Sequence, residues 1–411
     1  MKTFLREVAE AMHAEHGTAL RDVAVILPTR RAGLYLRNEL AAVAGAALWS
    51  PELFTFPEFM QRLSGVHLVD RVTGLFDLYT ISAQNGKREP LEAFLSWAPA
   101  VLRDMSEVDA HMIDLAAFYC DLRAIEEIEN WSLRSMGTPS PGQQRLMDHW
   151  SRMKELHAAL NLRSIELGRG SAGWMERTAV ERCAKGEARM EWKAAWFVGA
   201  NALTTAQQRV LEHCRASGIA RLAWDADRWY LDFPQQEAGH HLRPLISSMG
   251  AGSVPPSDHL RTLDRSVRVV ELPDDLSQCW HAASLITGMS KAERARTAIV
   301  LADESLLMPL LRALPAAAGP VNVTMGALLR TLPAAAWIEA VLALHQCATT
   351  TAIGYAELEA LLLHPYLQRI DVTGSRDVVE RLRGLERPFI PRNVVVTVID
   401  ELVPALASGI S

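Results

Sequence analysis

Two short, fully apolar runs limit the fold of this chain more than any other sequence feature. Val23–Leu27 has the sequence VAVIL and Ala194–Val198 has the sequence AAWFV, followed by a proline and a glycine respectively. Continuous apolar runs of this length are typical of strands that are buried on both faces of a parallel sheet. Leu53–Phe56 and Ile219–Trp224 also have strand character, and helical patterns lie between the runs. Because strands that alternate with helices form parallel sheets with right-handed crossovers, the sequence predicts an α/β fold.

The segment from 66 to 191 has a different character. Stretches such as 91–105 (LEAFLSWAPAVLRDM) and 143–160 (QQRLMDHWSRMKELHAAL) place apolar residues at helical spacing, with almost no strand pattern. Loops rich in glycine, serine or proline separate these stretches. We therefore expect a large helical insertion between two parts of the first α/β lobe.

A second α/β block is predicted after a linker. The stretch Gly250–Pro256 is rich in glycine and proline, as linkers often are. Beyond it, Val267–Leu272 and Thr297–Leu301 are predicted strands, and Val321–Thr324 continues the pattern. The chain from Tyr355 onward is mostly helical in character. The predicted organisation is a first lobe over 1–65 and 192–250, its helical insertion over 66–191, the start of a second lobe over 266–345, and a helical insertion of that lobe over 346–411.

The composition excludes several classes of protein. The chain has 411 residues, of which 49% are hydrophobic and 22% charged, so it is not mainly disordered. It has no apolar run of about 18 residues that would span a membrane. Its first residues, MKTFLREVAEAMHAEH, lack the apolar stretch of a signal peptide. Five cysteines without C-x-x-C spacing indicate reduced thiols. These patterns predict a cytoplasmic protein without a membrane segment.

The charge balance by itself gives no support for nucleic-acid binding. The chain carries 42 basic and 48 acidic residues and has a net charge of −6, whereas a basic chain would favour such binding. Of the basic residues, 36 are arginine and 6 are lysine. Arginine suits bidentate phosphate contacts. A chain rich in alanine and arginine, however, more often reflects a GC-rich genome.

The sequence contains no catalytic signature that we recognise. The phosphate-binding loop G-x-x-x-x-G-K-S/T and the nucleophile elbow G-x-S-x-G are both missing. Asp225 and Asp227 could form a two-carboxylate metal site, but capping of a loop is the favoured interpretation. His240 and His241 are adjacent, so they do not share a helix face as zinc ligands do. We assign no catalytic residue, no metal site and no cofactor.

Polar residues follow the predicted strands, at the edge where open parallel sheets bind ligands. Thr29, Arg30 and Arg31 occupy the first strand-to-helix turn. There, a helix N-terminus and two guanidinium groups could hold an anion. The alternative, a solvated helix edge, stays open for the same arginines. The other candidates at strand ends are Gly199, Asn201, Asp303 and Glu304.

Several short blocks together resemble a known family. The blocks are 25–34 (VILPTRRAGL), 49–56 (WSPELFTF), 197–203 (FVGANAL), 224–230 (WDADRWY) and 322–326 (NVTMG). In this order they resemble the amino-terminal part of AddB/RexB-like proteins of the Bacteroidetes-type branch. These are inactivated superfamily 1 helicase subunits that usually end in a PD-(D/E)XK nuclease domain. The resemblance covers essentially the whole chain, but it consists of short blocks and not of one catalytic signature.

The resemblance implies two degenerate RecA-like lobes with parallel sheets and a role in DNA repair and recombination. In this role, the chain would bind single-stranded DNA weakly or scaffold a helicase–nuclease partner. The residues that would face the DNA channel are Thr29, Arg30, Arg31, Gly199 and Asn201. Asp303 and Glu304 would belong to the strand-end block that opens the second lobe.

The departures from the family pattern define what we do not expect. The phosphate loop is missing, a PD…E-x-K set is missing, and so is the four-cysteine iron–sulfur pattern of some relatives. We therefore expect neither ATP hydrolysis nor nuclease activity from this chain. Two alternatives remain: a two-lobed α/β transferase acting on a nucleotide or a sugar, and a pure protein-interaction scaffold.

Overall fold

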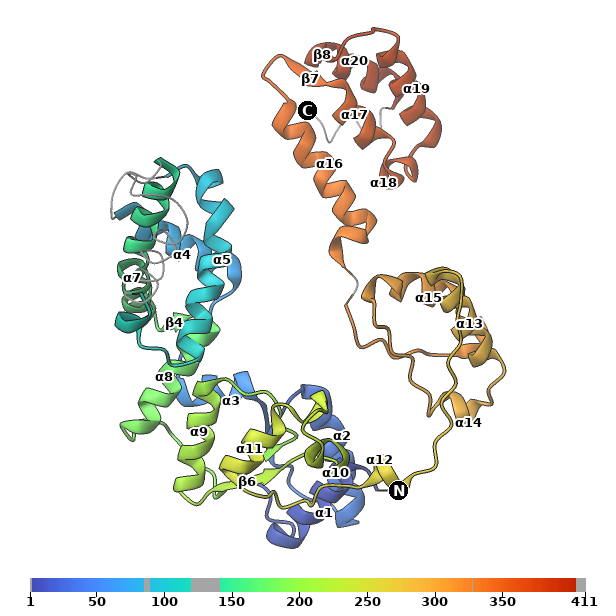
Figure 1. Ribbon diagram of the computed structural model, residues 1–411. Coiled ribbons are helices and arrows are strands. Elements are labelled where there is room, and N and C mark those ends of the chain that lie inside the picture. Colours follow the sequence, from blue (N-terminus) through green and yellow to red (C-terminus); the bar gives the residue numbers. More distant parts are fainter. Residues whose placement is uncertain (1, 85–88, 120–140, 327, 404–411) are drawn as a thin grey trace, which may run out of the picture. The chain divides into compact units, whose positions relative to one another are not determined.

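The computed structural model divides the chain into two compact units, Met1–Arg265 (unit 1) and Ser266–Ser411 (unit 2). It describes residues 2–84, 89–119, 141–326 and 328–403 (Figure 1). Each unit is described by itself below. In these residues, no helix combines the length and the apolar character needed to cross a membrane.

Unit 1 is built on a four-stranded parallel sheet, which makes the fold α/β. The strands are β1 (Val23–Leu27), β2 (Glu52–Thr55), β5 (Ala194–Val198) and β6 (Ala220–Ala223), in the order β2-β1-β5-β6. The predicted strands 23–27 and 194–198 are confirmed residue for residue. β2 ends one residue earlier than predicted, because Thr55 caps the helix that begins at Phe56. β6 is two residues shorter than its predicted run.

Helices cover both faces of this sheet, so its strands alternate between two cores. Ala24 and Ile26 of β1 pack into one cluster, and Val23, Val25 and Leu27 pack into the other. Because alternate side chains of β1 point into one core or the other, no position of the run is polar. The helices around the sheet and after it are α1 (Phe4–His16), α2 (Arg30–Ala44), α3 (Phe56–Ser64), α8 (Ala172–Ala184), α9 (Thr205–Ala216), α10 (Arg228–Asp232), α11 (Leu242–Met249) and α12 (His259–Thr262).

The segment between α3 and α8 is mostly helical, as its periodicity predicts. It contains α4 (Arg71–Gln84), α5 (Leu91–Ala110) and α7 (Pro141–Leu167), which share an apolar core of their own. A short parallel pair that the sequence pattern did not predict, β3 (His67–Leu68) and β4 (Arg169–Gly170), joins the two ends of the segment.

A glycine at the start of α8 brings this helical segment close to the rest of unit 1. A Cβ atom on Gly173 would lie 1.6 Å from the carbonyl oxygen of Ser106 in α5, so no larger residue fits there. The backbone N–H of Gly173 donates to Oγ of Ser106 at 2.9 Å. The position therefore requires glycine because two helix backbones approach each other, and not because of an unusual φ angle.

A buried polar network also links these helices. Nε2 of His157 lies 3.0 Å from Oδ2 of Asp109, and Nδ1 of His157 lies 3.1 Å from the hydroxyl of Tyr119. Nε of Arg177 lies 2.8 Å from the other oxygen of Asp109, which is 1% exposed. Burial, together with the charges of Asp109 and Asp104, raises the pKa of Tyr119 to about 12. The sequence analysis identified none of the network residues.

Unit 2 consists mainly of helices around one short antiparallel pair. The core of its second half includes Leu358, Val378, Ile390 and Val395, which are all buried. Its elements are α13 (Asp275–Thr287), α14 (Lys291–Arg294), η2 (Glu304–Leu306), α15 (Leu307–Ala313), α16 (Pro333–Cys347), β7 (Ala352–Gly354), α17 (Tyr355–Leu362), α18 (Pro365–Gln368), α19 (Val372–Arg383), β8 (Phe389–Pro391) and α20 (Arg392–Leu402).

The strands predicted at Val267–Leu272 and Thr297–Leu301 are wrong for the structure described. Neither segment forms a strand or pairs with a described strand, and Val321–Thr324 is likewise unpaired. Val269 is 90% exposed and Val300 is 88% exposed. A strand needs a hydrogen-bonded neighbour for its backbone and a covered face for its valines. Neither is present in the described part of unit 2, so no parallel sheet forms there.

Candidate functional site at the carboxyl edge of the sheet

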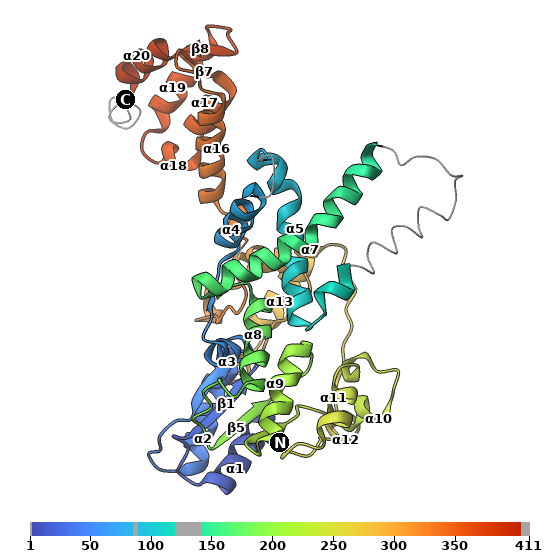
Figure 2. The ribbon, with the colours of Figure 1, turned by 90° about the vertical axis from the view of Figure 1, so that its left-hand side faces the viewer.

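The two polar blocks predicted at strand ends of unit 1 lie on neighbouring strands. Ile26 of β1 pairs with Phe197 of β5 in parallel register, so the turns that follow both strands reach the same edge of the sheet (Figure 2). A Cβ atom on Gly199 would lie 3.7 Å from Pro28, which confirms that the two turns touch. The structure therefore brings together Thr29, Arg30, Arg31, Gly199 and Asn201, which we call the edge site.

Glycine at position 199 allows the turn after β5. Its φ angle is +68°, in the left-handed region that other residues rarely adopt. The chain can therefore reverse at once and carry Asn201, which is exposed, to the sheet edge. Substitution of Gly199 would strain this turn even though space for a Cβ atom exists.

Thr29 begins the helix that carries the two arginines. Its backbone is extended, and its hydroxyl accepts a hydrogen bond from the N–H of Ala32 at 3.2 Å, as an N-cap residue does. No acidic residue lies in the first turn of α2, which Arg30 and Arg31 begin. Because a helix N-terminus carries partial positive charge, two guanidinium groups there are electrostatically unfavourable without an anion.

Glu58 supplies one such anion, and sequence reasoning missed it. Nε of Arg30 donates to Oε1 of Glu58 at 2.6 Å. Burial raises the pKa of Glu58, but hydrogen bonds from Thr55 and Arg30 outweigh it and hold that pKa below its usual value. Thr55 and Glu58 form a capping box at the start of α3. The T-x-x-E spacing of Thr55 and Glu58 could have predicted the capping box. It gives no indication of the contact between Glu58 and Arg30.

Arg31 and Asn201 remain available at the edge site. In the described part of the chain, no side chain or backbone group forms a hydrogen bond or ion pair with either side chain. Arg31 is partly buried, and Asn201 is exposed. The charge that the edge site offers to a ligand therefore comes mainly from Arg31, whereas Arg30 is shared with Glu58.

The two acids that follow β6 have different environments. Asp227 is 4% exposed and caps α10; its oxygens accept from Trp229 N–H, Ser257 O–H and Leu260 N–H. Desolvation by the surrounding protein raises the pKa of Asp225, although the residue is exposed. The favoured loop-capping interpretation is confirmed for Asp227. Among the described residues, no group of three or more His, Cys, Asp or Glu is placed to hold a metal ion.

Asp303 and Glu304 belong to unit 2 and do not follow a strand. Asp303 caps the short helix η2, and its carboxylate accepts from the N–H of Ser305 at 2.8 Å. The hydrogen bonds from Ser305 lower the pKa of Asp303. The prediction that these acids lie at a strand end is wrong, because Thr297–Leu301 is not a strand. They are therefore not part of the edge site.

Burial makes two of the described cysteines, Cys183 and Cys214, poor nucleophiles. Cys183, Cys214 and Cys279 are buried free thiols, Cys347 is partly exposed, and Cys120 lies outside the described residues. Burial raises the pKa of Cys183 to about 11 and that of Cys214 to about 12. Since the thiolate is the reactive form, both are inert thiols at neutral pH. Within the described part of the chain, the prediction of reduced thiols agrees with these residues.

Contacts near the edge site tie it to the helical segment. Thr204, the N-cap of α9, donates its hydroxyl to Glu176 of α8 at 2.6 Å, and Gln207 donates to the same carboxylate at 2.7 Å. Nδ1 of His111 lies 3.3 Å from Oγ1 of Thr205. The loop that carries Asn201 is therefore followed by a helix start that the helical segment holds in place.

Comparison with known proteins gives no independent identification. Neither the protein-family models nor the curated protein sequences contain a match to this chain. The resemblance to AddB/RexB-like proteins rests on the sequence blocks alone.

Proposed function

We propose that the chain is a non-catalytic, helicase-like module of a DNA-repair helicase–nuclease, with degenerate RecA-like lobes, and that its edge site binds a phosphate of single-stranded DNA. One observation carries the proposal. The parallel pairing of β1 and β5 brings together two blocks that are at least 168 residues apart in the sequence.

 The Thr29–Arg31 turn and the Gly199–Asn201 turn therefore border one another at the sheet edge, where Arg31 has no partner among the described residues.

The chemistry of the edge site favours a phosphate over a carboxylate or a neutral group. The first turn of α2 offers backbone N–H groups and partial positive charge, and Arg31 adds a guanidinium group that can form two parallel hydrogen bonds. Asn201 can donate to a second phosphate oxygen or to a base. Because Glu58 competes for Arg30, binding should be weak, sensitive to salt and tolerant of sequence, with a dissociation constant on the order of micromolar or higher.

The transferase alternative has less support from the described residues. It requires Asp225 and Asp227 to act together, but the carboxylate of Asp227 is buried and already accepts three hydrogen bonds. The pure scaffold alternative is decided by the DNA-binding experiment below.

Fluorescence anisotropy with a labelled single-stranded oligonucleotide, measured at several salt concentrations, tests the proposal. Arg31→Ala should lower the affinity and reduce the dependence of log K on log salt by about one phosphate equivalent. Arg30→Ala should have a smaller effect, because Glu58 already neutralises that side chain. Glu58→Gln should increase the affinity, since it frees Arg30 and removes a negative charge from the edge.

Arg37→Ala is the matched control. Arg37 lies on the same helix, away from its first turn, and its Nε donates to Ser50. Arg31→Ala and Arg37→Ala change the net charge equally, so only the loss of a direct contact with DNA should make their affinities differ. If the wild type shows no binding at low salt, or if the Arg31 and Arg37 variants lose affinity equally, the edge site does not bind DNA and the scaffold alternative takes its place.

A further inference from the structure

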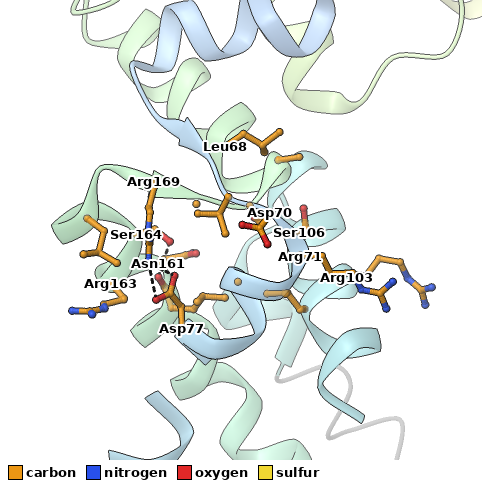
Figure 3. A pocket seen from close by; sticks show the side chains of 18 of the residues that line it. Leu68, Asp70, Arg71, Asp77, Arg103, Ser106, Asn161, Arg163, Ser164 and Arg169 are labelled. Atoms are coloured by element: carbon orange, nitrogen blue, oxygen red, sulfur yellow. Dashed lines mark hydrogen bonds and ion pairs between the residues drawn. The ribbon is translucent and has the colours of Figure 1, made fainter. Parts of the chain in front are cut away.

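We propose that the helical segment of unit 1 contains a binding pocket for a small aliphatic carboxylate. The pocket has a volume of about 490 Å³ and lies where α4, α5 and α7 meet the β3–β4 pair (Figure 3). Pockets for small molecules in proteins usually have volumes of about 300–1,000 Å³. This pocket is separate from the edge site, and the inference does not depend on DNA binding.

Aliphatic side chains form part of the pocket wall, beside its polar residues. They include Leu102 and Pro99 of α5 and Leu160 and Leu167 of α7. Among the described residues that line the pocket, none is aromatic. Nucleobases are usually held by stacking on aromatic rings or on arginine planes. The lining therefore favours an aliphatic body over a planar heteroaromatic one.

A fixed guanidinium group lies in this apolar pocket. Nη2 of Arg169 donates to both carboxylate oxygens of Asp77, at 3.1 and 3.0 Å, and Figure 3 shows these two side chains facing each other. Asp77 comes from α4 and holds the guanidinium plane in one orientation. The Arg169 side chain is 38% exposed, and no described residue accepts from its Nη1. That nitrogen is therefore a prepositioned donor for a ligand.

Two other polar side chains of the lining, Ser106 and Asn161, have donor groups that form no hydrogen bond with a described residue. Oγ of Ser106 accepts from Gly173 N–H, which leaves its own O–H free to donate. The amide of Asn161 forms no hydrogen bond with a described residue. Together with Arg169, these groups offer donors to the ligand.

Two of the three acidic residues of the lining are already engaged. Asp70 accepts from two backbone N–H groups at the start of α4, and Asp77 is held by Arg169. Oε1 of Glu107 lies 4.0 Å from Nε of Arg103. Free donors together with engaged acceptors favour a ligand with an anionic acceptor over an amine. An aliphatic body with a carboxylate combines both requirements.

Calorimetric titration of the full chain with sodium octanoate tests this proposal, with octylamine as the ligand of equal chain length and opposite charge. We expect octanoate to bind and octylamine to bind at least about tenfold more weakly, as charge-assisted hydrogen bonds predict. Leu102→Trp should fill the pocket and abolish octanoate binding. Arg169→Lys should weaken octanoate binding by about tenfold, because lysine keeps the charge but lacks the planar fork.

Arg163→Ala is the matched control for Arg169. Arg163 also lines the pocket but is paired with Glu166 at 3.4 Å. Its loss should weaken octanoate binding much less than the change at Arg169 does. If Leu102→Trp lowers the melting temperature, the comparison of the Arg169 and Arg163 variants still decides the result. Octanoate binding that is absent at millimolar concentration, equal to that of octylamine, or equally weakened in both arginine variants would overturn the proposal.

Discussion

Val25 in unit 1 and Val269 in unit 2 occupy the middle of two similar β-branched runs, but Val25 is fully buried whereas Val269 is 90% exposed. The run around Val25 pairs with β2 on one side and with β5 on the other. The run around Val269 has no paired strand in the described part of the chain. A β-branched run therefore becomes a strand only when other parts of the chain supply hydrogen-bonded neighbours and a covered face.

The same difference applies to charged residues. In unit 1, Asp109 is 1% exposed and contacts both His157 and Arg177. In unit 2, Arg383 and Glu359 form an ion pair in which the arginine side chain is 64% exposed. The contacts of Asp109 are buried, whereas the Arg383–Glu359 pair is open to water. The comparison predicts that equivalent substitutions have unequal effects in the two units.

Asp109→Ala should have the largest effect. It leaves Arg177 and His157 without their buried anion, and removal of one partner from such a pair costs about 3–5 kcal/mol of the free energy of unfolding. Glu359→Ala in unit 2 should cost less than about 1 kcal/mol, because water screens the pair that it removes. Urea unfolding of the full chain, monitored in the unit that carries the substitution, measures both losses in the free energy of unfolding. Equal losses would contradict the comparison.

Val25→Ala should have the next largest effect, since it leaves a cavity between β1 and its covering helices. We expect a loss of about 2–3 kcal/mol in the free energy of unfolding. The matched change Val269→Ala should alter stability by no more than about 0.5 kcal/mol. A loss above this limit for Val269→Ala, measured by the same urea titration, would show that the segment is covered in solution.

The smallest losses of stability are expected for substitutions in two capping boxes, one in each unit. Thr204 caps the 12-residue helix α9 and also donates to Glu176, which is 6% exposed. Ser290 caps the four-residue helix α14, whose residues are not buried. Thr204→Ala should therefore cost about 1–2 kcal/mol. Ser290→Ala should cost only about a few tenths of a kcal/mol, because little of the surrounding structure depends on α14. Hydrogen exchange of the two helices separates the effects, and a larger loss for Ser290→Ala would reverse the conclusion.

Local patterns made much of unit 1 predictable. The runs 23–27 and 194–198 are apolar at every position, so they indicate strands covered on both faces without further information. Gly199 after β5 and Thr29 after β1 are local turn and cap signals. These features allowed the sequence to predict both turns of the edge site.

Contacts between distant residues were not predictable in the same way. Arg30 and Glu58 are 28 positions apart, and Asp109 and His157 are 48 apart. No spacing rule relates such pairs, because tertiary packing brings them together. The pocket beside Arg169 combines residues of α4, α5, α7 and the β3–β4 pair and has no sequence pattern of its own. The unpaired segments of unit 2 show the opposite error, in which a local pattern predicted strands that lack neighbours.

The pairing of β1 with β5 also has a consequence for the order of events at the ribosome. Residues 28–193 separate the two strands, and the whole helical segment lies among them. At translation rates of about 5–20 residues per second, β1 waits on the order of ten to thirty seconds for this neighbour. During that time the VAVIL run has an open edge that can pair with other nascent chains. The helical segment, which has its own apolar core, is therefore synthesised while the central sheet beside it is still incomplete.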